Sequence, residues 1–278
     1  MPNYSKMHES SGHLAHLIDL FMFKGAPENH DADHPVTVLV NHGYVAGFAP
    51  SRNQPLWSAY RVAHADEAVD YDRPHFYYAD ERIGESARLS KDTFGKHDGI
   101  GYHVGHMVPN EVINVQFGRL AQLETFFMTN MCPQRGSLNT GVWLKLENAI
   151  RNIKDTTGQK DHMWVIVGPV FGADPDHIER DDGKMVPIPE AFYCVSVDPF
   201  RYPYDTPGAV EIACFLIPQN APAGSSPSDY LASLSEIEAA TKLKFMPGWD
   251  ATVPRSAPRS PSRSRGAATQ VNRLLAQF

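Results

Sequence analysis

The chain has 278 residues, of which 42% are hydrophobic, and a formal net charge of −7 at pH 7. This acidic balance excludes nucleic-acid binding through overall positive charge, while a local basic cleft stays open. No apolar run approaches the roughly 20 residues that span a bilayer, so the sequence predicts no membrane partner.

The first 35 residues predict an N-terminal extension with one short helix. Apolar residues between Leu14 and Met22 recur at helical spacing. The segment lacks a basic flank and a small-residue cleavage site, so we do not interpret it as a signal peptide. Localisation therefore stays open at this stage.

Residues 36–250 predict one α+β domain with a mainly antiparallel central sheet flanked by helices. The segments rich in β-branched and apolar residues alternate with helices irregularly, without a βαβ rhythm. Strands are predicted at residues 36–41, 55–62, 164–170, 191–197 and 210–217. Helices are predicted at residues 117–128, 139–153 and 230–241. Residues 90–101 are interpreted as a polar loop that leads to His103 and His106.

Residues 251–278 predict a basic tail rich in Pro, Ser and Arg. Four arginines and no acidic residue occur between Val253 and Arg265, so we expect disorder there. A short helix at 269–276 stays open. Such a tail could help to hold polyanions, and a plain solvated terminus explains it as well.

The three cysteines, Cys132, Cys194 and Cys214, show no CxxC spacing. This argues against a zinc ribbon and against a disulfide framework. We predict buried free thiols, and one disulfide between distant partners stays open.

His106 is the first candidate for chemistry. It stands between Gly105, which lets the backbone approach a substrate, and a Met-Val-Pro run that fixes the chain beyond it. An imidazole can act as a base near neutral pH, and a positioned base contributes roughly 10²–10⁴ in rate. The chain has 13 histidines, so a structural or surface role is the alternative for any one of them.

Asn139, Trp143, Glu147 and Arg151 are spaced four apart, so they form one ridge of the predicted helix. A neighbouring apolar stripe can pack on the sheet and turn this ridge toward a cleft; it contains Val142, Leu146, Ile150 and Ile153. A magnesium ion keeps several waters and needs only one or two protein ligands, so Asn139 could bind it and Glu147 could hold its waters. An ordinary amphipathic helix explains the spacing equally well.

Three linked segments resemble the non-specific DNA/RNA endonucleases of the ββα-metal class, the group that includes mitochondrial endonuclease G. They are His103-Val104-Gly105-His106, Thr129-Asn130-Met131-Cys132-Pro133-Gln134, and the Asn-x-Gly-x-Trp-x-x-Leu-Glu pattern from Asn139 to Glu147. Upstream, the Pro55–Tyr60 and Arg73–Phe76 segments look like further landmarks of this class.

The resemblance implies Mg²⁺-dependent hydrolysis of DNA and RNA with little sequence preference, leaving 5′-phosphate ends; Mn²⁺ would substitute. His106 would be the general base and Asn139 the metal ligand, in a ββα-metal motif. Glu147 would support the metal-bound waters. Asn130 would help to orient the active-site loop.

Arg73 and Arg151 would bind the scissile phosphate, a task that suits bidentate guanidinium donors. The chain departs from the family pattern at His103 and Val104, where the family has Asp and Arg. Losing the carboxylate would lower activity or shift the pH optimum, or His103 would bind phosphate instead. We expect an active enzyme, and the alternative is a catalytically weakened relative that binds nucleic acid.

His103 and His106 form an HxxH pair with His97 nearby, which leaves a zinc-bound structural protein as a weaker hypothesis. An active nuclease endangers its own cell, so we expect export, compartmentation or an inhibitor protein. Homodimers are common in the family, although no residue here indicates one.

Overall fold

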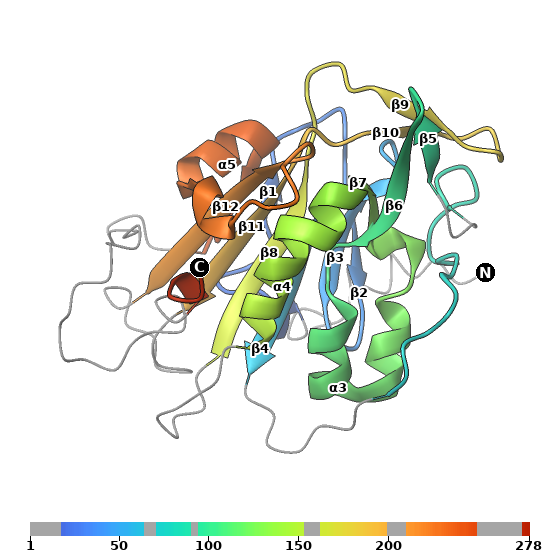
Figure 1. Ribbon diagram of the computed structural model, residues 1–278. Coiled ribbons are helices and arrows are strands. Elements are labelled where there is room, and N and C mark those ends of the chain that lie inside the picture. Colours follow the sequence, from blue (N-terminus) through green and yellow to red (C-terminus); the bar gives the residue numbers. More distant parts are fainter. Residues whose placement is uncertain (1–17, 64–70, 90–93, 153–161, 199–209, 249–273) are drawn as a thin grey trace, which may run out of the picture.

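The computed structural model describes residues 18–63, 71–89, 94–152, 162–198, 210–248 and 274–278. Its centre is a seven-stranded antiparallel sheet with the order β13-β12-β11-β8-β4-β3-β2 (Figure 1). The strands are β2 (Thr37–Val40), β3 (Val45–Ala49), β4 (Gln54–Ala63), β8 (His162–Val170), β11 (Ala191–Asp198), β12 (Glu211–Pro218) and β13 (Leu231–Ala232). The predicted α+β class with a mainly antiparallel sheet is confirmed.

Within the described residues, seven further strands form three small antiparallel sheets. One sheet has three strands, β5 (Gly95–His97), β6 (Ile100–His106) and β7 (Met131–Arg135). The other two are the pairs β1 (Glu28–Asn29) with β14 (Leu243–Lys244), and β9 (His177–Glu179) with β10 (Met185–Pro187). The three-stranded sheet matters most here, because it carries His103 and His106.

The helices occupy both faces of the central sheet. The long ones are α3 (Asn110–Glu124), α4 (Trp143–Arg151) and α5 (Leu234–Thr241). Short helical turns are η1 (Met128–Asn130), η2 (Leu138–Val142), which has π-helical hydrogen bonding, and η4 (Pro227–Tyr230). Figure 1 shows α4 lying across the middle of the sheet, with α3 beside β2 and β3.

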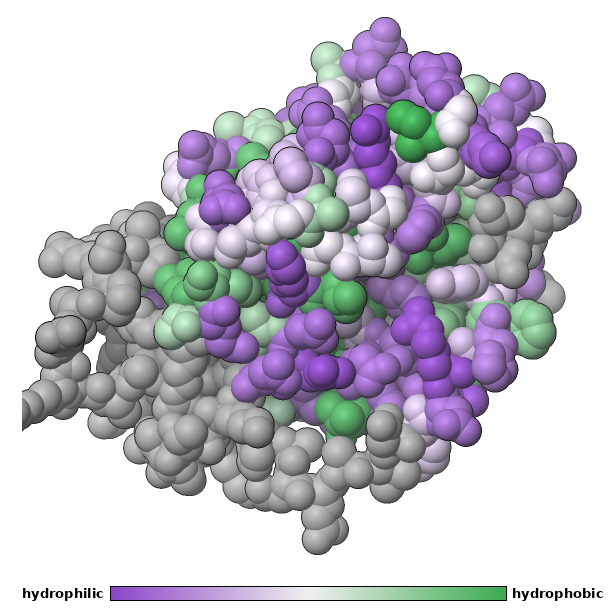
Figure 2. All heavy atoms as spheres, in the orientation of Figure 1, coloured by the Kyte–Doolittle hydropathy of each residue, from purple (hydrophilic) through white to green (hydrophobic). Residues whose placement is uncertain are grey.

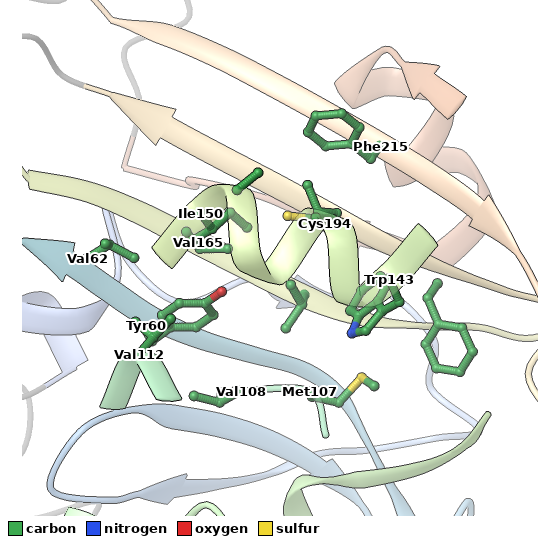
Figure 3. Close-up of a cluster of buried hydrophobic side chains, with 14 of the residues drawn as sticks. Tyr60, Val62, Met107, Val108, Val112, Trp143, Ile150, Val165, Cys194 and Phe215 are labelled. Carbon is green, nitrogen blue, oxygen red and sulfur yellow. The ribbon is translucent and has the colours of Figure 1, made fainter. Parts of the chain in front are cut away.

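The core between α4 and the sheet holds the site helix in place. Trp143 and Ile150 of α4 point toward the sheet, where Val165 and Cys194 lie (Figure 3). The predicted apolar stripe is confirmed at Val142, Leu146 and Ile150, which are all buried, while Ile153 lies outside the described residues. Leu274, Leu275 and Phe278 join this same cluster. The Phe278 ring meets the Phe215 ring edge-on at 5.9 Å.

A second core covers the opposite face of the sheet. It contains Trp57, Ile166 and Tyr193 together with Phe21 and Phe245 from outside the sheet. Residues 18–21 are helical, as predicted for part of 14–23, and the remainder before residue 18 lies outside the described residues. Most of the predicted basic tail also lies outside them. The division of the chain at residues 35 and 250 stays a prediction.

Several predicted boundaries are wrong. The helix predicted at 117–128 begins earlier, at Asn110, and ends at Glu124. Its first turns bury Val112 and Ile113, which do not form one continuous apolar stripe with the residues after 117, so the sequence pattern missed them. Gly118, with φ 77°, interrupts the helix. The described part of the predicted loop at 90–101 contains β5 and the start of β6. Polar and glycine-rich strands of this kind lack the apolar alternation that identifies a strand.

All three cysteines are buried and free, as predicted, and no disulfide joins them. Cys132 lies on β7, and Cys194 and Cys214 lie on neighbouring central strands. The helix predicted at 230–241 is shorter, because η4 and β13 take its first residues before α5 begins at Leu234.

Candidate functional site

Two antiparallel strands followed by a helix build the candidate site. In β6 and β7, His103 pairs with Gln134, Gly105 with Cys132 and His106 with Met131. A Cβ at Gly105 would overlap the buried Gln134 side chain, which explains the glycine directly before His106. The chain then passes through η2 into α4.

His106 is the last residue of β6. Its ring packs edge-on against Phe126 at 4.9 Å and lies 5.8 Å from the Tyr77 ring. The side chain is buried, and its Nε2 atom has no hydrogen-bond partner among the described residues. Burial, with a smaller contribution from the Arg73 charge, lowers the pKa of His106 to about 3. The imidazole is therefore neutral at pH 7 and can accept a proton.

Asn130 fixes the chain immediately after His106. The fully buried side chain accepts a hydrogen bond from the Val108 amide and donates to the Val108 and Thr125 carbonyls, each at 3.0 Å. The Asn130 carbonyl also accepts from the Met107 amide at 2.9 Å. These hydrogen bonds are those expected of a residue that orients the chain after His106. The role of Asn130 in activity stays a prediction.

Glu147 stands on α4 and receives a hydrogen bond from the Trp143 indole at 3.0 Å. Burial raises the pKa of Glu147 to about 8, against the opposing effects of the Trp143 hydrogen bond and the Arg73 charge. Trp143 itself is in the core, so the predicted ridge does not continue unbroken to Asn139. The reason is η2: its π-helical turn, with Gly141 at φ −105° and ψ −114°, separates Asn139 from α4.

The two predicted phosphate-binding arginines approach from different elements. Arg73 is exposed, and its guanidinium lies 5.1 Å from the centre of the Phe126 ring, the same ring that packs on His106. Arg151 ends α4 and lies 3.8 Å from the Glu111 carboxylate of α3. Both side chains are accessible for a phosphate group.

One cavity of about 220 Å³ brings five of the seven predicted site residues together: Arg73, His106, Asn139, Glu147 and Arg151. Asn130 and His103 do not line it. The Asn130 side chain instead makes hydrogen bonds to the main chain of Val108 and Thr125. His103 contacts the Asn139 side chain but does not line the cavity. On the face of the molecule that carries α3 and α4, hydrophilic side chains predominate in the described part (Figure 2).

The cavity also contains residues that the sequence did not single out, namely Tyr77, Asn110, Glu111, Val112, Thr140, Leu144 and Asn148. Asn110 and Glu111 directly follow the segment from His106 to Pro109, so their proximity was the available signal. A larger cavity of about 370 Å³, lined in part by Arg52, Phe171 and Lys242, contains none of the predicted site residues.

The donor set of the smaller cavity fits a hydrated divalent cation. Asn139 offers an amide oxygen and Glu147 a carboxyl group, and oxygen atoms of these kinds are the ligands that Mg²⁺ and Mn²⁺ accept. Within the described ranges, no group of three or more His, Cys, Asp or Glu side chains could enclose a metal ion. The residues therefore fit a site with few protein ligands and several waters, as the sequence predicts.

The zinc-bound structural hypothesis finds no support. His106 packs on Phe126, His103 contacts Asn139, and His97 lies near Asp98 and Asp176 at 3.5 and 3.8 Å. The three imidazoles thus have different partners and do not converge.

The opposite pKa shifts of Glu147 and His106 predict a pH dependence of stability in the metal-free protein. Glu147 holds a proton in the folded state up to about pH 8, whereas its ordinary pKa is 4.5. Its stabilising contribution is therefore complete below pH 4.5 and is lost as the pH rises toward 8. For His106, with an ordinary pKa of 6.5, the contribution is present above pH 6.5 and is lost as the pH falls toward 3.

Between pH 6.5 and 8 only Glu147 of this pair changes the stability. We expect the free energy of unfolding of the wild type to fall across this window, and Glu147→Gln to reduce that fall. Urea unfolding in the presence of a chelator measures both. Glu111→Gln, which removes a carboxylate from the same cavity, is the matched control and keeps the wild-type slope. An equal slope in wild type and Glu147→Gln contradicts the assignment.

Comparison with known proteins adds an independent line of evidence. The sequence profile of the family described as DNA/RNA non-specific endonuclease matches residues 28–252. "Nuclease 1, mitochondrial" of Schizosaccharomyces pombe is 25% identical over 224 residues, covering 74% of this chain and 65% of that protein. "Nuclease EXOG, mitochondrial" of Mus musculus is 26% identical over 220 residues, covering 74% and 56%. The chain thus spans less than two thirds of both relatives.

Two further comparisons concern a bacterial relative and the fold. "Nuclease" of Serratia marcescens is 24% identical over 218 residues, covering 76% of this chain and 75% of that protein. The crystal structure of an EndoG/EndoGI complex superposes with a TM-score of 0.66 at 20% identity, covering 88% of this chain and 95% of that one. No helix within the described ranges has the length and apolar character that crossing a membrane requires.

Proposed function

The chain belongs to the DNA/RNA non-specific endonuclease family, and from this premise we propose that it is a metal-dependent nuclease acting on DNA and RNA. It would hydrolyse phosphodiester bonds with little sequence preference and leave 5′-phosphate ends. The observation that carries the proposal is the cavity that joins a buried neutral imidazole, an amide, a carboxylate and two guanidinium groups. These groups come from a stretch of 79 residues, from Arg73 to Arg151, so the fold has to bring them together.

In the proposed mechanism His106 removes a proton from the attacking water. Its neutral ring provides a lone pair, and its packing on Phe126 fixes the direction of that lone pair. Asn139 would bind a divalent cation, and Glu147 would hold waters around it. Such a cation, Mg²⁺ or Mn²⁺, would supply positive charge beside the scissile phosphate.

Arg73 and Arg151 would hold the phosphate from two sides. Their guanidinium groups can each donate two parallel hydrogen bonds to phosphate oxygens. Arg151 would exchange its 3.8 Å contact with Glu111 for the substrate, which costs little because both side chains are partly exposed. The segment from His106 to Lys154 has five basic and three acidic residues, so binding would be weak, sequence-tolerant and sensitive to salt.

The proposal predicts metal-dependent cleavage that requires Asn139. Plasmid DNA and a structured RNA are incubated with the protein, with Mg²⁺ or Mn²⁺ and with a chelator. We expect cleavage only with metal, and a loss of roughly 10-fold or more in Asn139→Ala, because metal affinity falls when a ligand is removed. Asn148→Ala, which changes an amide in the same cavity, is the control. Unchanged cleavage in the chelator refutes the metal dependence.

The second candidate function is a catalytically weakened relative that binds nucleic acid. The observation that favours it is the replacement of the family Asp and Arg by His103 and Val104. DNA binding without turnover at every metal and pH tested would establish it. Any metal-dependent turnover that His106→Ala removes would exclude it.

We also propose that the host is protected from this activity by compartmentation or by an inhibitor protein. Several similar nucleases carry "mitochondrial" in their names, and the similar solved structure is of EndoG with EndoGI. Fractionation of the native host, followed by affinity capture with the full chain, tests both routes. Size-exclusion chromatography with light scattering tests the homodimer that the family resemblance predicts.

A further inference from the structure

His103 stands where the family pattern has aspartate, and the structure gives its imidazole a defined orientation. The residue lies on β6 opposite Gln134 and is exposed. Its Nε2 atom lies over the backbone of Gly136, where an added Cβ would be 3.1 Å away. Its Nδ1 atom lies 3.3 Å from the side-chain amide nitrogen of Asn139. One ring nitrogen therefore faces the predicted metal ligand.

The turn between β7 and η2 holds this arrangement. Thr140 donates a hydrogen bond from its hydroxyl to the Gly136 carbonyl at 2.8 Å. Gly136 leaves room for the His103 ring, and Asn139, in η2, reaches into the cavity that contains Glu147. The His103 ring of β6 and the Asn139 amide of η2 are thus adjacent, with the turn at Gly136 beside the ring.

The 3.3 Å between His103 Nδ1 and the Asn139 side-chain nitrogen is close to the separation of two neighbouring ligand atoms on one metal ion. Neighbouring ligand atoms about 2.1 Å from an octahedral ion, at a right angle to each other, lie about 3.0 Å apart. The amide oxygen and nitrogen of asparagine exchange places by a rotation about χ2, so either can face His103. With the oxygen facing His103, an imidazole nitrogen and an amide oxygen would converge on one point.

Replacing aspartate with histidine changes the chemistry of the donor set. Imidazole nitrogen binds first-row transition metals well, whereas Mg²⁺ favours carboxylate, carbonyl and water oxygens. An imidazole at this position could take the place of one of the waters of a hydrated cation held by Asn139.

We propose that His103 is a second protein ligand of the divalent cation that Asn139 holds. It shifts the preference of the site from Mg²⁺ toward Mn²⁺ and related transition metals. The inference rests on the proposed function, because it concerns the same cation. It differs in predicting a nitrogen ligand, which can be observed without measuring cleavage.

Electron spin-echo spectroscopy of the Mn²⁺-loaded full chain tests for that nitrogen. We expect a ¹⁴N modulation from a directly bound imidazole in the wild type and its loss in His103→Ala. His97→Ala, which removes an imidazole from the same small sheet, is the matched control and retains the modulation. Calorimetric titration gives the companion result: His103→Ala weakens Mn²⁺ binding by about tenfold and Mg²⁺ binding less, while His103→Asp moves the preference back toward Mg²⁺.

The outcomes separate this inference from the proposed function. Mn²⁺ binding without a ¹⁴N modulation overturns the inference and leaves the nuclease intact. A modulation that disappears in His106→Ala but persists in His103→Ala overturns it as well, since the base would then be the ligand. Absence of any Mg²⁺ or Mn²⁺ binding to the wild type overturns both the inference and the metal site of the proposed function. Circular dichroism of each variant shows that loss of binding is not loss of fold.

Discussion

Replacing His106 with alanine is expected to lower the rate of DNA and RNA cleavage by roughly 10²–10⁴-fold, the contribution of a positioned general base. The reason is geometric: the described residues offer no other imidazole in the cavity. The low pKa of the free ring, about 3, makes it a weak base before substrate arrives. A bound phosphate would offset the Arg73 charge, which is the smaller cause of this shift, and so would raise the pKa in part, while burial, the larger cause, keeps it low.

The measurement is single-turnover cleavage of a labelled duplex at saturating enzyme, which separates chemistry from binding. His106→Ala also removes a ring that packs on Phe126, so His106→Gln serves as the second variant, with a similar volume and no basic nitrogen. Both variants should retain DNA affinity. Cleavage at the wild-type rate in His106→Gln contradicts the assignment of the base. His42→Ala, an exposed histidine paired with Glu124, is the control for loss of imidazole alone.

Replacing Asn130 with alanine is expected to destabilise the fold by about 2–4 kcal/mol and to reduce cleavage at least tenfold. The substitution leaves the Val108 amide and the Val108 and Thr125 carbonyls without their side-chain partner in a buried region. Each unsatisfied buried group costs about 1–3 kcal/mol, with partial relief from water. The activity falls further than stability alone requires, because Val108 is two residues from His106.

Gln219→Ala provides a matched control for Asn130→Ala. The buried Gln219 side chain also makes three hydrogen bonds to the main chain, accepting from Arg135 and donating to Pro133 and Pro189. We expect a similar loss in urea stability but a smaller loss of cleavage at low temperature, where both variants stay folded. Equal losses of cleavage in the two variants would show that Asn130 acts only through stability.

The sequence predicted the central sheet well where strands are apolar on both faces. Residues 164–170 and 191–197 lie within β8 and β11, because consecutive β-branched residues suit a buried strand. It failed at β6, where two glycines and two histidines weaken the signal of the alternating Ile100, Tyr102 and Val104. This strand is held by pairing with β7, and such long-range pairing leaves no local signal.

In the site, too, local helical spacing predicted some residues correctly, whereas contacts between residues distant in the sequence were not predicted. Helical spacing placed Glu147 and Arg151 on one side of a helix, and both line the cavity. Spacing also placed Trp143 there, but its indole is buried in the core and only its N–H group reaches Glu147, at 3.0 Å. The Phe126 ring, which contacts both His106 and Arg73, was not predicted, because only the fold brings it next to residues 20 and 53 positions earlier in the chain.

The packing of α4 determines at which point of synthesis this helix gains all of its packing partners. Gln277 donates a hydrogen bond to the carbonyl of Ala149, 128 positions earlier, and Leu274 joins the core behind the helix. At a translation rate of about 5–20 residues per second, these partners emerge roughly 6–25 s after α4. Contacts of such high sequence separation also slow folding, because loop closure precedes the gain from packing. The helix that carries Glu147 and Arg151 is therefore fully packed only when nearly all of the described chain has been made.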